Sequence, residues 1–216
     1  VTIDGTVEKH PERKVTGEEQ IVVAGELLRV QRTLTLMLHK PQGVVSAARD
    51  ARDKTVLELV PPEYRRKELF PAGRLDKDTE GLLLLTNDGE LAHRLLSPKY
   101  HVDKRYFARV DGELSAADTE AFARGMTLGD GLECLPAGLE LLPGRACIVT
   151  LREGKFHQVK RMLAARGKPV VYLKRLSMGP IALDPALAPG EWRPLTGEEK
   201  ALLRRGTAGD PGFSAF

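Results

Sequence analysis

Cysteine is scarce in this chain of 216 residues, and the spacing of the two that occur, Cys134 and Cys147, matches no metal site. One pair of cysteines also cannot supply the disulfide framework on which small secreted domains depend. We therefore expect a protein of a reducing compartment, and the cytoplasm is the expected location.

Long apolar runs are missing as well. No stretch approaches the roughly 20 apolar residues that a membrane-spanning helix needs, and the pattern of a signal peptide is not seen. With 42% hydrophobic and 29% charged residues, the composition is typical of a soluble globular protein. We expect no membrane partner.

Net charge is small, only +3, but it is unevenly distributed. The segment from Arg152 to Arg175, called the basic block below, holds eight Lys and Arg residues and a single acid, Glu153. Such a block can be the electrostatic footprint of a polyanion such as RNA. It can equally be the solvated face of a helix, and charge alone leaves both interpretations open.

Turn residues divide the chain into regions. In residues 1–28, the pairs Asp4-Gly5 and Ala24-Gly25 interrupt alternating apolar residues, which predicts short strands joined by turns. Residues 29–33 are interpreted as a linker, and residues 34–205 as the main domain. Residues 206–216 are rich in Gly and Pro and are expected to form a flexible tail.

The main domain is predicted to be α+β, with more strand than helix, a mainly antiparallel sheet and helices that flank it. Strand patterns occupy segments 34–47 (two strands around a Pro-Gln-Gly turn), 81–88, 104–112, 132–152 and 169–179. Helix patterns occupy segments 54–65 (stopped by Pro61-Pro62), 89–96 (capped by Asp88), 115–126 (capped by Ser115) and 154–167 (closed by Gly167).

The stretch FPAGRLDKDTEGLLLLTNDG, residues 70–89, places acids at 76, 78 and 80. It superficially follows a calcium loop, but that loop needs a bidentate Glu where Asn87 stands. For Asp78 and Glu80 the favoured interpretation is a decorated turn. Asp76 differs, because Arg74 shares its face of an extended segment and a charge pair beside a buried strand is costly unless it is used.

A basic residue near the core could pair with the Asp76 carboxylate. In the predicted helix 154–167, the apolar stripe consists of Phe156, Val159, Met162 and Leu163. Lys160 falls at the edge of this stripe, whereas His157 and Arg161 point further outward. Lys160 either extends past the core to solvent, as such lysines commonly do, or serves as the counter-ion that keeps a buried carboxylate ionised.

Five segments in the same order resemble the RsuA branch of the pseudouridine synthases. AGRLDKDTEGLLLLTNDGELAHRLLSP is similar to its catalytic G-R-L-D motif, and DKRYFARV to its K-x-Y motif. REGKFHQVKRMLAARG resembles its E-G-(K/R)-x-H-Q-V-(K/R)-R-M motif, and HKPQG and LAPGEWRPLTGEE match landmarks near the two ends. The resemblance covers roughly residues 34–205.

This resemblance implies a function. Uridine in RNA would become pseudouridine by cleavage of its N1–C1′ bond, rotation of the uracil and formation of a C5–C1′ bond, without a cofactor or a metal. Asp76 would be the essential aspartate, Tyr106 the active-site tyrosine that stacks on the target base, and Lys160 the partner of Asp76. The residues implied to contact substrate are Arg74, which helps displace the target base, Lys104, Lys155, His157, Gln158 and Arg161.

Residues 1–28 are similar to the second half of an S4 RNA-binding domain, whose basic helical first half has no counterpart ahead of Val1. RNA affinity is therefore expected to be modest. The form HQVKRM, with His157, is most similar to enzymes of the small subunit, so the expected partner is 16S rRNA, free or within an assembling small subunit, bound by a monomer. The alternatives are 23S rRNA or tRNA as substrate, and a non-catalytic assembly factor that binds RNA.

Overall fold

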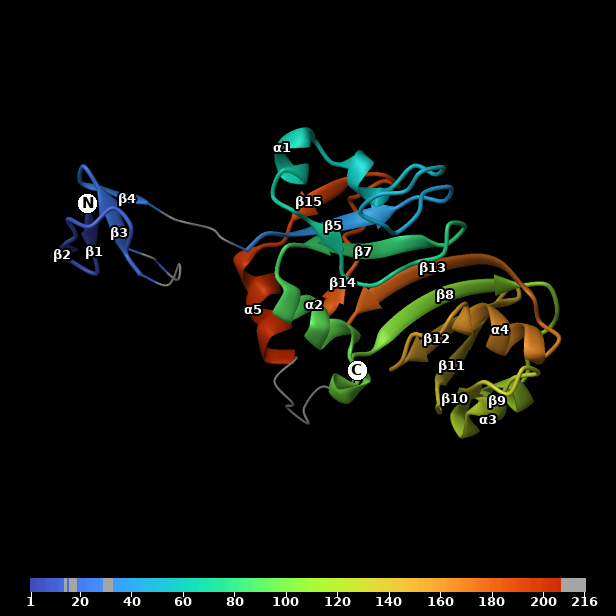
Figure 1. The fold of residues 1–216 in the computed structure, drawn as a ribbon. Coiled ribbons are helices and arrows are strands. Elements are labelled where there is room, and N and C mark those ends of the chain that lie inside the picture. The colour runs from blue at the N-terminus through green and yellow to red at the C-terminus, as the bar shows by residue number, and fades with distance from the viewer. Residues whose placement is uncertain (14, 16–18, 29–32, 207–216) are drawn as a thin grey trace. The chain divides into compact units, whose positions relative to one another are not determined.

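The computed structural model describes residues 1–13, 15, 19–28 and 33–206. The chain divides into two compact units, Val1–Leu34 and Thr35–Phe216 (Figure 1). Most of the predicted linker, 29–33, and of the predicted tail, 206–216, lies outside the described residues. Within the described part of the chain, no helix is both long and apolar enough to cross a membrane.

The smaller unit is a four-stranded antiparallel sheet in the order β2-β1-β3-β4. Its strands are β1 (Thr2–Ile3), β2 (Thr6–Val7), β3 (Ile21–Val23) and β4 (Glu26–Leu28). Both residues of each predicted turn, Asp4-Gly5 and Ala24-Gly25, have positive φ, as tight hairpin turns of this kind require. The prediction of short strands is confirmed, and the likeness to an S4 domain stays a prediction.

A large mixed sheet dominates the second unit, in the order β11-β12-β8-β13-β7-β5-β15, with β14 beside β13 and β6 beside β7. Its strands are β5 (Thr35–Lys40), β6 (Phe70–Pro71), β7 (Glu80–Thr86), β8 (Lys104–Val110), β11 (Gly138–Leu142), β12 (Ala146–Leu151), β13 (Val170–Met178), β14 (Ile181–Ala182) and β15 (Trp192–Pro194). A separate pair consists of β9 (Met126–Thr127) and β10 (Glu133–Cys134). Pairing in the large sheet is antiparallel except between β7 and β13, so the predicted α+β class is confirmed.

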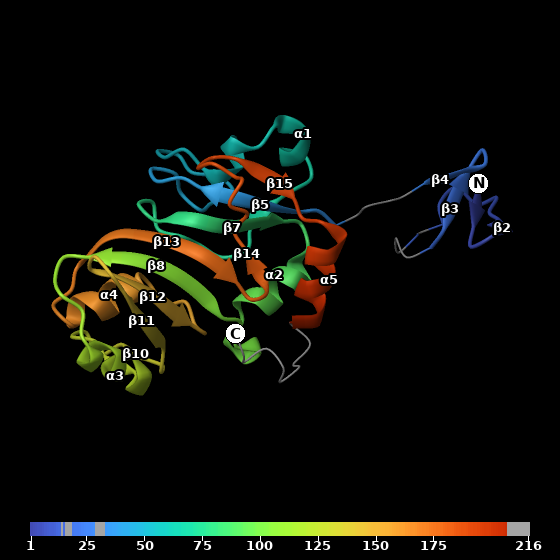
Figure 2. The same cartoon turned by 180° about the vertical axis from the view of Figure 1, so that it is seen from behind.

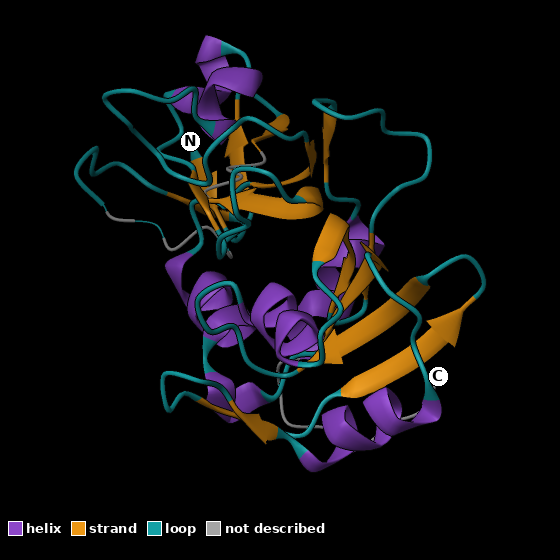
Figure 3. Ribbon diagram, turned by 90° about the vertical axis from the view of Figure 1, so that its right-hand side faces the viewer, coloured by secondary structure: helices purple, strands orange, loops and turns teal. Residues whose placement is uncertain are grey.

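Helices flank this sheet (Figure 3). They are η1 (Val56–Leu59), α1 (Pro62–Arg65), α2 (Gly89–Leu96), η2 (Pro98–Tyr100), α3 (Ala116–Arg124), α4 (Gln158–Ala165) and α5 (Gly197–Gly206). Front and back views show α2 beside α5, and α3 and α4 near β11 and β12 (Figures 1 and 2). Apolar residues of α2 and α5 join those of β5 and β7 in one buried cluster, which includes Met37, Leu82, Leu84, Leu95 and Leu203.

Two predicted caps are present. The Asp88 carboxylate accepts a hydrogen bond from the backbone N–H of Leu91 at 2.9 Å, which satisfies a donor that α2 itself leaves unpaired. At α3, Ser115 and Asp118 form a reciprocal capping box. The sequence therefore predicted both where these two helices begin and which side chains cap them.

Two local predictions were wrong, and a third, the short helix stopped by Pro61-Pro62, was right only in part. After β5, the expected second strand is only an isolated bridge between Val45 and Thr55. Segment 54–65 forms a 3₁₀ turn and then the separate helix α1, because Pro62 occupies the first helical position, where a missing N–H costs nothing. Helix α4 begins at Gln158, four residues later than predicted.

Candidate active site

The loop between β6 and β7 carries Asp76 and is held in place by hydrogen bonds to Ser46. The hydroxyl of Ser46 accepts a hydrogen bond from the Leu75 N–H at 3.0 Å and donates one to the Leu75 carbonyl at 2.9 Å. A turn follows, in which the Thr79 N–H donates to the Asp76 carbonyl at 3.0 Å. The backbone on both sides of Asp76 is thus held, which limits the positions that its carboxylate can take.

Lys40, at the end of β5, is buried beneath the same turn, with an exposed fraction of 0%. Its ammonium donates to the carbonyls of Thr79 at 2.9 Å, Pro41 at 3.0 Å and Lys77 at 3.3 Å. Burial lowers the pKa of Lys40 to about 8, and the nearby carboxylates, Asp76 first, oppose that shift. Lys40 therefore ties the Asp76 turn to the sheet.

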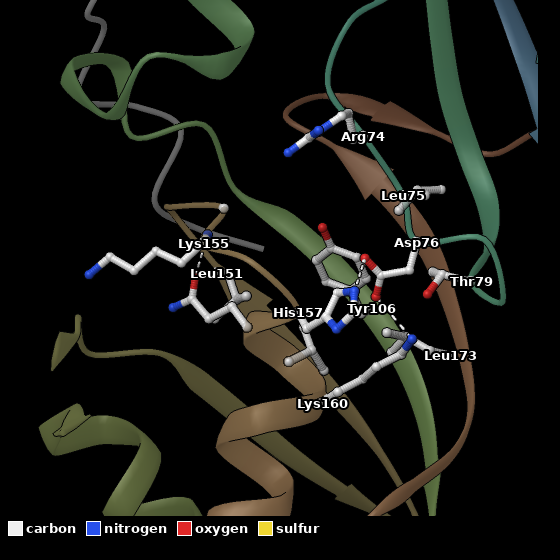
Figure 4. Close-up of a pocket in the computed structure, with 13 residues that line it drawn as sticks. Arg74, Leu75, Asp76, Thr79, Tyr106, Leu151, Lys155, His157, Lys160 and Leu173 are labelled. Carbon is white, nitrogen blue, oxygen red and sulfur yellow. Dashed lines mark hydrogen bonds and ion pairs between the residues drawn. The ribbon is translucent and has the colours of Figure 1, made fainter. Parts of the chain in front are cut away.

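Asp76 meets two basic side chains from the segment around α4 (Figure 4). Its Oδ2 lies 2.9 Å from Nζ of Lys160, and its Oδ1 lies 3.4 Å from Nε2 of His157. Asp76 is 25% exposed at its side chain and Lys160 21%. The predicted contact between Asp76 and its counter-ion, Lys160, is confirmed. The carboxylate of Asp76 remains partly exposed and lines a cavity.

Lys160 is shared between two carboxylates. Its Nζ also lies 2.5 Å from Oδ1 of Asp78. Burial by itself lowers the pKa of Lys160, but the hydrogen bonds to Asp78 and Asp76 outweigh it and raise the pKa. The hydrogen bond from Lys160 also lowers the pKa of Asp78. Asp78 was predicted only to decorate a turn, and that interpretation was incomplete because an ion pair 82 residues apart leaves no local signal.

Two adjoining cavities share Asp76 as a wall. The smaller has about 70 Å³ and the larger about 780 Å³. Tyr106, from β8, lines both and is 9% exposed, and its ring lies near Asp76 and His157 (Figure 4). The larger volume is in the range of cavities that hold small ligands. A carboxylate, a cation and an aromatic ring therefore converge where one nucleoside could enter.

His157 ends up against Asp76 rather than in a helix pointing outward, which corrects the prediction. It stands before the first turn of α4 in a left-handed conformation, with φ 49°. Phe156 was predicted in the apolar stripe and is instead 69% exposed. Val159, Met162 and Leu163 are buried as predicted.

Arg74 and Lys104 lie at the larger cavity, which they both line. Arg74 is exposed and extends away from Asp76 (Figure 4), so the pairing inferred from their shared face does not form among the described residues. Lys104 is buried and donates to the Val102 carbonyl at 3.1 Å. Burial lowers the pKa of Lys104 to about 8, and the charge of Arg175 adds to the shift.

Other residues that the resemblance assigned to substrate are engaged within the protein. The Lys155 ammonium lies 3.1 Å from Glu153 and also contacts the Glu133 carbonyl. Gln158 is buried and donates to Glu153 at 2.5 Å. Both line the smaller cavity. Arg161 lines neither cavity and pairs with Asp130 at 2.5 Å, so the structure does not bring it to Asp76.

Most cations of the basic block pair with carboxylates. Five of its eight cations have carboxylate partners: Arg152 with Asp103, Lys155 with Glu153, Lys160 with Asp76 and Asp78, Arg161 with Asp130, and Arg166 with Asp118. These ion pairs do not decide between the two interpretations, so contact of the block with RNA stays a prediction. The block mainly ties α4 and its flanks to neighbouring segments.

Sequence reasoning missed three residues at this site: Lys40, Ser46 and Arg175. Arg175 is 2% exposed, donates from Nε to the Leu82 carbonyl at 2.7 Å and lines the larger cavity. The only sequence signal for Lys40 and Arg175 was a charged residue inside an otherwise apolar strand, since a buried charge requires a partner or a use. Among the described residues, no group of three or more His, Cys, Asp or Glu could hold a metal ion.

Comparison with known proteins agrees with this geometry. The family model described as RNA pseudouridylate synthase matches residues 34–165. An uncharacterized RNA pseudouridine synthase of Bacillus subtilis is 51% identical, covering 94% of this chain and 87% of its own. The ribosomal small subunit pseudouridine synthase A of Pseudomonas aeruginosa is 44% identical, with 92% and 84% covered.

Solved structures agree as well. A crystal structure of a pseudouridylate synthase superposes with a TM-score of 0.76 at 38% identity, covering 94% of this chain and 87% of that one. These relatives are named as synthases, so they do not support the alternative of a non-catalytic assembly factor. The chain therefore belongs to the RNA pseudouridylate synthase family and is a pseudouridine synthase.

Proposed function

We propose that this enzyme converts a uridine of 16S rRNA to pseudouridine and that Asp76 is its essential catalytic group. The observation that supports the site most strongly is the carboxylate of Asp76, 2.9 Å from Lys160, in a cavity that Tyr106 also lines. Binding of RNA alone would not require a carboxylate at the centre of the cavity, because it would repel phosphates.

The chemistry needs an ionised carboxylate close to C1′ of the target nucleoside. Asp76 acts either as the nucleophile at C1′ or as the base that takes a proton from C2′, and both routes use the same charged form. In either route the N1–C1′ bond breaks, the uracil turns and C5 bonds to C1′. C5 then loses its proton and N1 gains one, and in the second route C2′ regains the proton that it lost, so the product is an isomer of uridine. Lys160 pairs with this carboxylate at 2.9 Å, and the ring of Tyr106 provides a face for the uracil.

The target base must leave its stack in RNA, which costs a few kcal/mol. The cleft of about 780 Å³ offers room for the extruded nucleotide. Arg74 stands at its rim, where a guanidinium can contact phosphate or fill the gap that the departing base leaves. Aromatic and basic groups at one site are what recognition of unstacked RNA bases uses.

The choice of 16S rRNA rests on relatives rather than on the cavity. Proteins of Pseudomonas aeruginosa, Vibrio cholerae and Escherichia coli that are 41–44% identical carry the name ribosomal small subunit pseudouridine synthase A. A uridine of 23S rRNA or tRNA is the alternative substrate within the same chemistry. We further propose that the enzyme is a cytoplasmic monomer that acts on free 16S rRNA or on an assembling small subunit.

The test is pseudouridine mapping of all stable RNA from cells that lack this protein. The proposal predicts the loss of one pseudouridine in 16S rRNA, its return with the wild-type chain and no return with Asp76→Asn. Loss of a pseudouridine from 23S rRNA or tRNA, with the 16S pattern intact, would mean that the reaction is as proposed but that the substrate is this other RNA.

A further inference from the structure

Phe156 is an exposed aromatic residue beside the catalytic carboxylate. Its exposed fraction is 69%, the highest among the large apolar side chains of the described chain. The other described phenylalanines, at 70, 107 and 122, are all at least partly buried. Phe156 lines the larger cavity rather than the core of the protein, so its ring is available to a ligand in that cavity.

The local backbone holds this ring in place. His157 adopts φ 49°, a conformation that a residue other than glycine seldom takes without support. The support comes from Gln158, whose side chain accepts from the Lys155 N–H at 3.0 Å and donates to Glu153 at 2.5 Å. These hydrogen bonds tie Gln158 to the residues that precede His157, which limits the directions in which the side chains of Phe156 and His157 can point.

One face of the Phe156 ring is already stacked. The imidazole of His157 lies 3.8 Å away, centroid to centroid, at an interplanar angle of 18°. The same imidazole lies 3.4 Å from Asp76. The order in space is therefore carboxylate, imidazole, phenyl ring, and the phenyl ring's side chain remains largely open to solvent.

We propose that Phe156, backed by His157, is a stacking platform for the nucleobase next to the target uridine. This inference rests on the proposed function, because it assumes an RNA substrate from which one base is extruded. Extrusion of the uridine removes a stacking neighbour from the adjacent base, and an aromatic side chain can replace that neighbour whatever the base. The larger cavity, which Phe156 lines, also carries the cations Arg74, Lys77 and Lys155, which suit the phosphates on either side of a nucleobase.

The experiment measures binding of a synthetic RNA that contains the uridine found by mapping. Asp76→Asn protein is used throughout so that the RNA stays unreacted. Three RNAs are compared: the natural sequence, one abasic immediately 5′ of the uridine, and one abasic immediately 3′ of it. Each is titrated against protein with Phe156 intact and against the Phe156→Ala, Phe156→Leu and Phe156→Trp variants.

With Phe156 intact, one of the two abasic RNAs should bind about tenfold more weakly than the natural RNA, as loss of one stacked base predicts. With Phe156→Ala or Phe156→Leu, the same abasic change should alter the Kd less than about twofold, because the platform is gone. Phe156→Trp should restore the sensitivity. Val171→Ala is the matched control, since Val171 is 64% exposed and lines neither cavity, and it should keep the full effect.

An abasic penalty that persists in Phe156→Ala would overturn the inference, as would a loss of affinity that is the same for natural and abasic RNA. Phe156→Leu covers the case in which truncation to alanine disturbs His157. Failure of the proposed function is seen separately, because mapping would then reveal another RNA, and the same comparison is made with that sequence.

Discussion

At the scale of single residues, the site is organised by two lysines with different tasks. Lys160 contacts the carboxylates of Asp76 and Asp78 from the side of the cavity. Lys40 contacts three backbone carbonyls from below the turn that carries both acids. One lysine therefore pairs with the carboxylates of the site, and the other holds its backbone.

Replacing Lys160 by methionine should lower the rate of pseudouridine formation on the order of 100-fold, because loss of one preorganised charge at a reacting centre typically costs that much. Two carboxylates would then lie close together without the cation that both contact. The measurement is the single-turnover rate at saturating RNA. Lys160→Arg, which keeps the charge, should retain most of the rate. A Lys160→Met rate within a few-fold of wild type would make the ion pair structural only.

Lys40 should give the enzyme a specific pH dependence of stability. Its pKa is about 8 in the folded protein against 10.5 ordinarily. Below pH 8 the lysine is charged in both states, and the folded state bears the cost of burying that charge. Between pH 8 and 10.5 the unfolded chain binds more protons, so a rise in pH stabilises the fold.

The stability of wild type relative to Lys40→Met should therefore increase from pH 8 to pH 10.5, by at most about 3 kcal/mol. Urea unfolding of both proteins at several pH values measures this difference. Lys104 is present in both proteins, so its titration cancels. A difference that is constant or falls with pH would mean that Lys40 is not buried as an ammonium.

The sequence predicted Asp76, Tyr106 and Lys160 correctly as neighbours, and the reason lies in the motifs that carry them. It could not predict Asp78 on Lys160 or Lys40 beneath the turn, since both contacts join segments that are far apart in the chain. Charged residues within apolar strands were the available hint. Arg175 in β13 gave the same hint and was also missed.

At the scale of elements, the site depends on the parallel pair β7 and β13. Gly81 of β7 has φ 108°, and a Cβ built there would lie 2.2 Å from the carbonyl oxygen of Arg175. Only glycine permits both this conformation and this approach. Because the Asp76 loop runs directly into β7, the spacing of the two strands sets where the carboxylate stands relative to Tyr106 on β8.

Gly81→Ala should lower the free energy of unfolding by about 2–4 kcal/mol, through backbone strain and overpacking together. Thermal and urea unfolding measure the loss. Gly89→Ala is the matched control, because Gly89 has open space around it at the first turn of α2 and alanine is the better helix former there. Equal stability of the two variants would contradict the close approach of β7 to β13.

Strand positions were predicted well because buried strands leave continuous or alternating apolar patterns, as in β7, β8 and β13. The predicted start of α4 was too early, because the periodic apolar pattern extends back to Phe156 whereas the helix begins only after His157. A left-handed histidine has no signature in periodicity. The prolines at 61 and 62 misled in a similar way, since proline both ends one helix and begins another.

At the scale of the whole molecule, the catalytic rate and part of the RNA affinity should depend on different units of the chain. All residues around Asp76 belong to the unit Thr35–Phe216. A protein reduced to that unit should fold and should keep the wild-type single-turnover rate at saturating RNA. Its Kd for RNA should rise if the first unit is part of an RNA-binding domain, as the sequence predicts. An unchanged Kd would remove the RNA-binding role of the first unit.

The most direct test of the role of Asp76 is the Asp76→Asn variant of the purified protein. The amide keeps the size and the hydrogen-bonding shape of the carboxylate but supplies neither a nucleophile nor a base. We expect no detectable pseudouridine after prolonged incubation with a substrate RNA, together with a wild-type Tm and an RNA affinity within about a few-fold of wild type. Pseudouridine formation by the Asp76→Asn variant at a substantial fraction of the wild-type rate would show that Asp76 is not the essential catalytic group.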